Sequence, residues 1–239
     1  MGNAYYTPDA TRAAKVNSLF ARIAPRYDLI NDLQSFGLHR LWKRRLARLA
    51  DSRPGLRALD LCCGTGDVAF ALARAGAEVT GLDFSEEMLA VANRRKSSAG
   101  TSPIEFLHGD ALKTPFPDAH FDIVTLSYGL RNLADFAGGL REMHRVTRPG
   151  GRLVILDFGK PPHPLWRALY FGYLRFAVPI FGRILCGDAA AYAYILESLQ
   201  HYPAQEGVAE TLRTLGCAKV RVINLLGGAM SLHCAEKAR

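Results

Sequence analysis

Cysteine is scarce in this sequence, and no cysteine stands in a spacing that would hold a metal or a redox pair. Five occur among 239 residues, with no C-x-x-C pair and no histidine at a metal-ligand distance along the chain. The adjacent Cys62 and Cys63 would point to opposite sides at a strand end, which favours packing over a disulfide. We therefore expect reduced, buried thiols in a cytoplasmic protein, and we predict no metal site.

Long hydrophobic runs, export signals and repeats are also lacking. The N-terminus has no charged segment followed by an apolar core, and Tyr6 stands where N-myristoylation requires Ser or Thr. Residues 161–187 are rich in aromatic side chains, but Arg167, Arg175 and Arg183 interrupt them, so no stretch approaches the roughly 20 apolar residues of a membrane-spanning helix. This segment could instead pack in the core, lie at a membrane interface or wall a pocket for an apolar substrate.

Charge is strongly unbalanced toward the basic side. The net charge is +8, with 49% hydrophobic and 22% charged residues, which suits one α/β domain. Arg40, Arg44 and Arg48 recur every four residues, and with Lys43 and Arg45 they predict one basic helical face. That face is either simply solvated or contacts the anionic cytoplasmic side of a membrane.

A glycine-rich run follows the first strongly apolar segment. Residues 56–61 have the apolar density of a buried strand, residues 62–67 read CCGTGD, and a helical pattern begins at Val68. Glycines allow a tight turn beneath a ligand, and the amides of the following helix would face that ligand. Such a loop suits NAD as well as S-adenosylmethionine.

Acidic residues at the ends of the next two apolar segments favour S-adenosylmethionine. Asp83 follows residues 77–82 and could accept both ribose hydroxyls, and Asp110 follows residues 104–107 and could accept the adenine amino group. Three loops would then meet on one adenosine. The contacts predicted from this loop and these strand ends are Asp60, Gly64, Thr65, Gly66, Asp83 and Asp110.

Apolar segments alternate with helical patterns along the rest of the chain. Strands are predicted at residues 56–62, 77–82, 104–107, 121–126, 151–157, 218–224 and 230–235. The last two are close enough for an antiparallel hairpin, an ending typical of methyltransferase sheets. We predict a single domain with a helical cap (about 8–50, broken at Pro25), a cofactor-binding core (52–160), an aromatic and basic insertion (161–204), and a terminal helix and hairpin (205–239).

Several motifs resemble the ubiquinone/menaquinone biosynthesis C-methyltransferases. Residues 27–42 resemble the N-terminal signature of that family and residues 145–152 its second signature, with further similarity at 128–132 and 192–198. The resemblance covers residues 16–237 and implies a class I S-adenosylmethionine-dependent fold, that is, a Rossmann-like seven-stranded sheet with an antiparallel terminal hairpin. It implies Thr65, Asp83, Asp110, Ala111 and Ser127 as cofactor contacts.

By the same resemblance, the substrate is a lipophilic polyprenylated quinol that is methylated on a ring carbon. Demethylmenaquinol is the leading substrate, with a ubiquinone precursor or a non-catalytic scaffold role as alternatives. The sequence departs from the family pattern at Ile30, at residues 157–159 and at Gln200, which makes the identity of the quinone less certain than the reaction class. The oligomeric state stays open, with a homodimer as one alternative.

Methylation of a ring carbon requires stabilisation of a phenolate and an acceptor for a proton. Arg131 suits the first role because its guanidinium stays charged, and for the same reason it is a poor base; a purely structural role is the alternative. Asn132 could hold a water, and Tyr27 and Asp28 of the cap could close over the ligands. Asp28 and His39 are candidate bases, although a lone histidine beside an aromatic residue is more often packed.

Two other classes of protein fit less well. Nucleic-acid amino methyltransferases usually follow the fourth strand with an acid or amide, two prolines and an aromatic residue, whereas Ser127-Tyr128-Gly129-Leu130 stands here. We therefore predict no nucleic-acid partner. A dehydrogenase would have no use for Asp110 or the terminal hairpin.

Overall fold

The computed structural model describes residues 12–99, 104–186 and 190–239. Within them, seven strands form one sheet in the order β3-β2-β1-β4-β5-β7-β6. The strands are β1 (Arg57–Leu61), β2 (Glu78–Asp83), β3 (Ile104–His108), β4 (Phe121–Ser127), β5 (Thr147–Phe158), β6 (Cys217–Leu225) and β7 (Met230–Lys237). β7 runs antiparallel to both of its neighbours, whereas the pairs among β1 to β5 are parallel. The predicted parallel sheet and terminal hairpin are confirmed.

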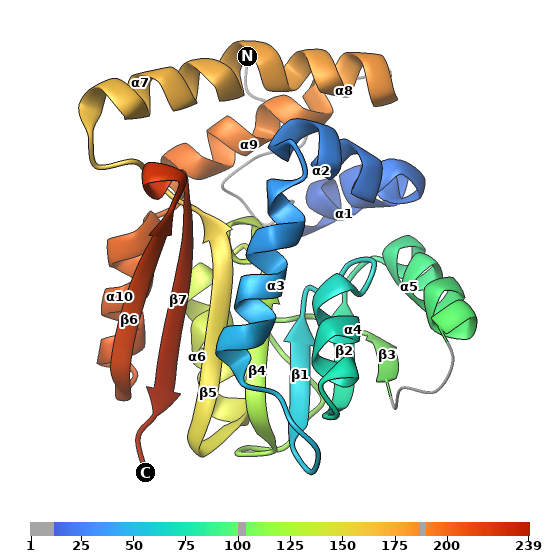
Figure 1. Ribbon diagram of the computed structural model, residues 1–239, viewed down its shortest axis with the longest axis vertical. Helices are drawn as coiled ribbons and strands as arrows, with labels where there is room; N and C mark the ends of the chain where they lie inside the picture. The colour runs from blue at the N-terminus through green and yellow to red at the C-terminus, as the bar shows by residue number, and fades with distance from the viewer. Residues whose placement is uncertain (1–11, 100–103, 187–189) are drawn as a thin grey trace.

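The central strands are buried along nearly their whole length. Six of the seven residues of β4 are buried, as expected for a parallel strand covered on both faces. β5 begins at Thr147, earlier than predicted, because an irregularity in the pairing lets Thr147 join Phe121 before the regular register resumes. In Figure 1, α3 (Leu38–Ala50) crosses one face of the sheet, and α6 (Phe136–Val146) and α10 (Ala204–Thr214) lie behind the opposite face.

The N-terminal cap covers the carboxyl end of the parallel strands. It consists of α1 (Arg12–Ile23), a 3-10 turn η1 (Ala24–Arg26), α2 (Tyr27–Ser35) and α3. The predicted break at Pro25 coincides with η1, whereas a second break at Phe36 and Gly37, both with positive φ, was not predicted. The predicted start of the cap at residues 8–11 lies outside the described residues.

One prediction about the side chains of the cap is wrong. Lys43 does not belong to the exposed basic face of α3, because it is buried and its ammonium lies 2.9 Å from a carboxylate oxygen of Asp67.

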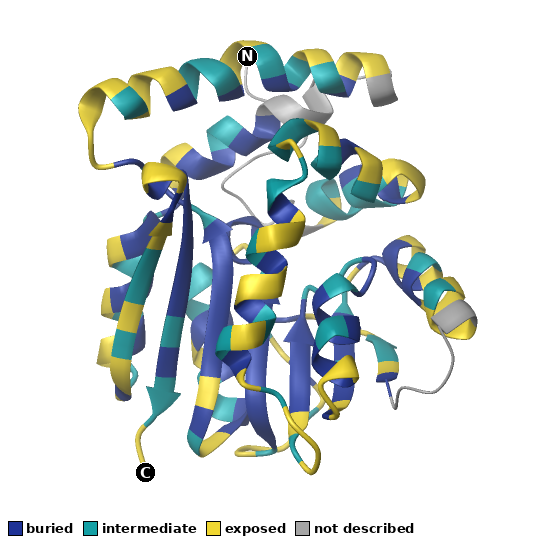
Figure 2. Ribbon diagram, viewed as in Figure 1, coloured by how far each residue is buried: buried dark blue, intermediate teal, exposed yellow. Residues whose placement is uncertain are grey.

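Helices of the insertion lie beside the cap over the same end of the sheet (Figure 1). They are α7 (Pro164–Gly172), the π-helical segment η3 (Tyr173–Ala177), α8 (Val178–Cys186) and α9 (Ala190–His201). The outer side of α7 and α8 is exposed, as Figure 2 shows, and it carries the large apolar side chains Leu165, Leu169, Phe176, Ile180 and Ile184. No helix within the described residues is long and apolar enough to cross a membrane.

The remaining helices follow the strand ends. α4 (Asp67–Arg74) follows the glycine loop, α5 (Glu86–Ala99) follows β2, and the 3-10 turn η2 (Leu130–Asn132) follows β4. A further 3-10 turn, η4 (Leu226–Gly228), connects the two strands of the terminal hairpin. The loops after β1, β2, β3 and β4 therefore all open toward the cap.

Candidate functional site

The glycine loop after β1 turns sharply through three residues with positive φ, Cys62, Gly64 and Gly66. The Gly64 N–H donates a hydrogen bond of 2.7 Å to Asp83 at the end of β2. A Cβ at Gly64 would meet no atom within 4 Å, whereas one at Gly66 would lie 2.9 Å from the rings of Phe70 and Phe106. Gly64 therefore faces open space, and Gly66 allows the loop to pack against those two rings.

A cavity of about 160 Å³, here called the loop cavity, opens above this turn. Its walls come from the glycine loop, from the ends of β2, β3 and β4, and from the cap. They include seven of the residues predicted to bind cofactor or to take part in catalysis: Tyr27, Gly64, Asp83, Asp110, Ala111, Ser127 and Asn132. The fold thus brings these residues together at one cavity.

Backbone amides hold two carboxylates of the loop cavity in place, and two further polar atoms there have no partner. Asp83 accepts hydrogen bonds from the amides of Gly64 and Ser85, and burial raises the pKa of its carboxyl. Asp110 accepts one from the Leu112 amide at 2.8 Å. The Ser127 hydroxyl and the side-chain oxygen of Asn132 are buried without a partner. Buried polar atoms are normally paired, so these two indicate a polar ligand.

Asp60 lies behind the loop and does not line the cavity. Its carboxylate accepts hydrogen bonds from the Ala69 amide at 3.1 Å and from the Thr125 hydroxyl at 2.7 Å, and burial raises its pKa to about 7. Asp60 therefore fixes the start of α4 against β4. The structure gives it a positioning role in place of the direct contact that the sequence predicted.

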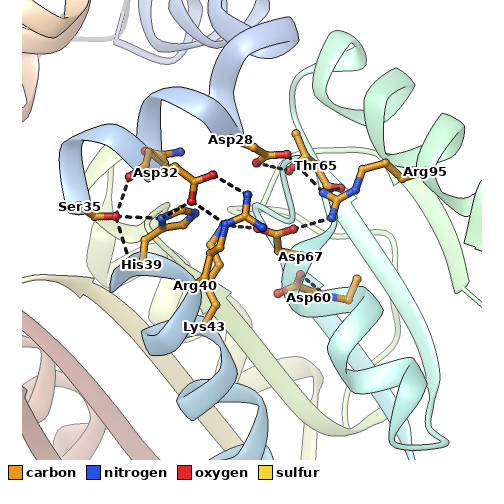
Figure 3. Close-up of polar contacts among 12 residues, drawn as sticks. Asp28, Asp32, Ser35, His39, Arg40, Lys43, Asp60, Thr65, Asp67 and Arg95 are labelled. Carbon is orange, nitrogen blue, oxygen red and sulfur yellow. Dashed lines mark hydrogen bonds and ion pairs between the residues drawn. The ribbon is translucent and has the colours of Figure 1, made fainter. Parts of the chain in front are cut away.

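Thr65 is engaged by the cap and is also absent from the cavity walls. Its hydroxyl donates a hydrogen bond of 3.0 Å to Asp28 of α2, and Arg95 of α5 lies 3.5 Å from the same carboxylate (Figure 3). Asp28 lines neither of the cavities described here. Its position does not support the predicted role as a base, and it instead joins the cap to the glycine loop.

A second ion pair reinforces this contact. Asp67, at the start of α4, accepts hydrogen bonds from Arg95 at 2.7 Å and from Lys43 of α3 at 2.9 Å (Figure 3). Burial opposes the ionisation of Asp67, but Lys43 and Arg95 outweigh it and hold the pKa of Asp67 well below its usual value. The cap and α5 are thus both tied electrostatically to the first turn of α4.

A larger cavity of about 320 Å³, here called the cap cavity, lies between the cap and the insertion. Its walls are mostly aromatic and aliphatic, and its polar side chains include Arg131 and His39. Phe20, Tyr27 and Tyr128 line both cavities, which therefore adjoin at these three side chains. Aromatic residues of the insertion, such as Trp166 and Tyr170, confirm that this segment walls a pocket.

Arg131 is only 3% exposed and lines the cap cavity. Its guanidinium donates to the Tyr128 carbonyl at 2.6 Å and to the Tyr194 hydroxyl at 3.1 Å, and it lies 3.6 Å from Asp157. Burial alone would lower the pKa of Arg131, but Tyr194 and Asp157 outweigh burial and raise it. Nε is buried without a partner, so one N–H remains for a ligand.

Tyrosines surround this guanidinium, and sequence reasoning singled out only one of them. Tyr27 was predicted, and burial raises the pKa of its hydroxyl well above the usual value. Tyr128 and Tyr194 were missed, although both stand in segments that carry the family resemblance. The Tyr128 hydroxyl is buried without a partner, and its backbone has positive φ.

Residues 9–237 match the model of the ubiE/COQ5 methyltransferase family. The chain belongs to this family. It is 38% identical to a demethylmenaquinone methyltransferase of Listeria welshimeri over 96% of this chain and 98% of that protein. It is 39% identical to one of Geobacillus kaustophilus over 95% of this chain and 98% of that protein.

Solved structures share the fold. An S-adenosylmethionine-dependent methyltransferase of Thermotoga maritima, described as a possible histamine N-methyltransferase, superposes with a TM-score of 0.67 at 18% identity, covering 92% of this chain and 99% of that one. A Haemonchus contortus phosphoethanolamine N-methyltransferase gives a TM-score of 0.62 at 18% identity, covering 81% and 52%. The predicted family, class I fold, methyltransferase activity and methyl donor are confirmed.

Proposed function

We propose that this ubiE/COQ5-family methyltransferase methylates a ring carbon of demethylmenaquinol, a polyprenylated naphthoquinol, in menaquinone biosynthesis. The observation that carries this proposal is the pairing of two adjoining cavities. One is smaller, is built on the glycine loop and includes the carboxylates of Asp83 and Asp110 in its wall, and the other is larger, mostly apolar and includes Arg131 in its wall. The relatives named demethylmenaquinone methyltransferase support this choice of ring.

The polar groups of the loop cavity fit S-adenosylmethionine. That molecule supplies an electrophilic methyl group on a sulfonium ion when it is bound. Asp83 would accept hydrogen bonds from ribose hydroxyls, and Gly64 leaves room for the ligand to approach the backbone. Asp110, Ala111, Ser127 and Asn132 line the same space and would hold the rest of the ligand. Asp60, Thr65 and Gly66 would act indirectly by shaping the loop.

Arg131 would stabilise negative charge on a ring oxygen of the quinol. A ring carbon becomes nucleophilic as its neighbouring hydroxyl ionises, and a fixed cation near that oxygen lowers the energy of the ionised form. The free Nε–H is a donor already in place, and its neighbours hold the guanidinium charged. Tyr27 and Tyr128, at the junction of the cavities, would exclude water from the reacting atoms.

The exposed apolar side of α7 and α8 would contact the membrane in which the substrate is dissolved. Leu169 belongs both to this side and to the wall of the cap cavity, so the two are continuous. Arg175 of η3 and Arg183 of α8 are also exposed and suit anionic headgroups. α3, whose basic face the sequence suggested for this contact, crosses one face of the sheet and extends away from α7 (Figure 1). We thus propose a cytoplasmic enzyme at the inner face of the membrane.

A labelled methyl group tests the proposed reaction. The full chain is incubated without oxygen with methyl-labelled S-adenosylmethionine and either a short-tailed demethylnaphthoquinol or the corresponding benzoquinol. We expect label in the naphthoquinol product at a higher kcat/KM. Faster transfer to the benzoquinol would favour a ubiquinone precursor as substrate, and label in neither ring would favour the scaffold role.

A further inference from the structure

His39, at the start of α3, lines the cap cavity and carries a ring nitrogen without a partner. Its side chain is 4% exposed and is part of the cavity wall. Nε2 is buried without a hydrogen-bond partner, whereas Nδ1 lies 2.9 Å from the Ser35 hydroxyl. A buried polar atom without a partner is uncommon in a folded protein and calls for an explanation.

Ser35 fixes which nitrogen of His39 carries the proton. The Ser35 hydroxyl donates its one proton to the Asn31 carbonyl at 2.6 Å, so toward His39 it acts as an acceptor (Figure 3). It accepts from the His39 backbone N–H at 3.2 Å and from Nδ1–H. In the neutral ring Nδ1 is therefore protonated, and Nε2 carries a lone pair.

The surroundings keep this imidazole neutral. Burial first, and then the nearby Lys43 ammonium, lower the pKa of His39 to about 4. Asp32 lies 3.7 Å from Nδ1 and opposes the shift, but its carboxylate is already held by Arg40 at 2.5 Å. Asp67 favours the charged ring and Arg40 disfavours it, both more weakly. Near neutral pH, Nε2 is an acceptor only.

We propose that Nε2 of His39 accepts a hydrogen bond from a ring hydroxyl of the bound quinol, and that this contact makes the site select the reduced ring over the quinone. This inference rests on the proposed function. A quinone oxygen can only accept, so a bound quinone would leave Nε2 without a partner, and unmade buried hydrogen bonds strongly reduce affinity. The Arg131 guanidinium only donates, and the oxygens of quinone and quinol can both accept from it. Discrimination between the two redox states is therefore assigned to His39.

Such selection has a chemical purpose. The quinol ring is electron-rich and can attack a methyl group through carbon, whereas the quinone ring is electron-poor and cannot. A site that bound both equally would be occupied by unreactive quinone from the membrane pool. His39 would thus act in binding, as a specificity-determining residue that touches the substrate.

The test compares one ring in its two redox states. A short-tailed 2-methyl-3-prenyl-naphthoquinol and its quinone are titrated without oxygen into the full chain loaded with S-adenosylhomocysteine. This pair cannot accept a further methyl group at the substituted ring carbon. We expect the wild type to bind the quinol about tenfold or more tightly than the quinone. His39→Phe should reduce this preference to within about twofold, mainly by weakening quinol binding.

Two further variants separate the contact from a structural role. His39→Gln can place an amide oxygen near the position of Nε2 and should retain most of the preference, as should the matched control His163→Gln on the surface. Ser35→Ala removes the acceptor for Nδ1–H, so the proton can move to Nε2. The ratio of quinol to quinone affinity should then decrease. If His39→Phe does not fold, Ser35→Ala decides the question.

Binding of S-adenosylhomocysteine to the loop cavity, which His39 does not line, reports whether each variant is folded. A wild type that binds neither ring would contradict the proposed function and this inference with it. A wild type that binds both rings equally, or a folded His39→Phe that keeps the quinol preference, would overturn only the inference.

Discussion

The hydroxyl of Thr65 in the glycine loop donates a 3.0 Å hydrogen bond to Asp28 in the cap. This contact joins the element that shapes the loop cavity to the element that covers it. Arg95 forms ion pairs with both Asp28 and Asp67. Asp28, Arg95 and Asp67 thus hold the cap over the loop. Asp28, which the sequence suggested as a base, therefore belongs to this set of contacts, here called the cap clamp.

A double-mutant cycle measures this clamp. Thr65→Val and Asp28→Ala each remove one partner, and we expect a coupling free energy of about 1 kcal/mol in the free energy of unfolding. Denaturant titrations of the wild type, the two single variants and the double variant give that value. Strictly additive effects would show that the contact contributes nothing to cap docking.

Asp83→Asn should weaken S-adenosylhomocysteine binding by about tenfold or more, because it replaces one of the two acceptor oxygens of the carboxylate with an NH₂ donor. It should also lower the melting temperature, because one of the Gly64 and Ser85 amides loses its acceptor. Calorimetric binding and thermal unfolding check the two effects. Glu87→Gln, also beside Ser85 but outside the cavity, is the control. Unchanged affinity in folded Asp83→Asn would remove Asp83 from the cofactor site.

Replacing Arg131 should slow methyl transfer more than it weakens binding in the loop cavity. Arg131→Ala would leave Asp157 buried without its cation, which would lower the free energy of unfolding by about 3–5 kcal/mol. Arg131→Lys, and Arg131→Ala combined with Asp157→Asn, are therefore the better variants. We expect a single-turnover rate lower by about 100-fold in the double variant and partial recovery with lysine. A wild-type rate in the folded double variant would leave Arg131 with a structural role only.

Stability should depend on pH through His39. Its pKa is about 4 in the folded chain and about 6.5 when unfolded, so between these values the unfolded state binds more protons and stability rises with pH. The difference in unfolding free energy between wild type and His39→Gln should therefore increase by about 2–3 kcal/mol from pH 4 to 6.5. Denaturant titrations across that range measure it. A constant difference would mean that His39 is not buried as a neutral ring.

Charge reversal tests the membrane contact. Arg175→Glu with Arg183→Glu should lower affinity for anionic phosphatidylglycerol vesicles by about 30-fold, as expected for roughly 1 kcal/mol for each basic residue at the surface. Arg44→Glu with Arg48→Glu makes the same change in net charge on α3 and should have little effect. Sedimentation with vesicles at low salt compares the two pairs. Equal losses in both would indicate a contact governed by net charge alone.

Strand-end residues could be predicted from sequence because the carboxyl ends of parallel strands meet at one edge of a sheet. Asp83 and Asp110 needed only the correct strand boundaries, whereas Ser127 was implied by the family resemblance and Arg131 needed the loop after β4. The hairpin followed from the short connection between its two apolar segments. These are properties of local pattern and topology.

Pairings between distant side chains could not be predicted in the same way. Spacing placed Lys43 beside exposed arginines, but its burial depends on Asp67 lying opposite it in the folded chain. Asp60 stands near the end of β1 and Thr65 in the glycine loop, and their side chains bond to Thr125 and Asp28, respectively. His39 gave only a weak signal, because its role depends on the hydrogen bond between its Nδ1 and Ser35 and on a cavity formed by two separate segments.

Phe20, Tyr27 and Tyr128 line both cavities, and this shared wall would couple the two binding equilibria. A ligand that shifts any of these rings changes the shape of the neighbouring space. By thermodynamic linkage, the factor by which the first ligand alters the affinity of the second equals the factor by which the second alters the first. Measuring either ligand's affinity in the presence of the other therefore yields the cooperativity of the pair from one side alone.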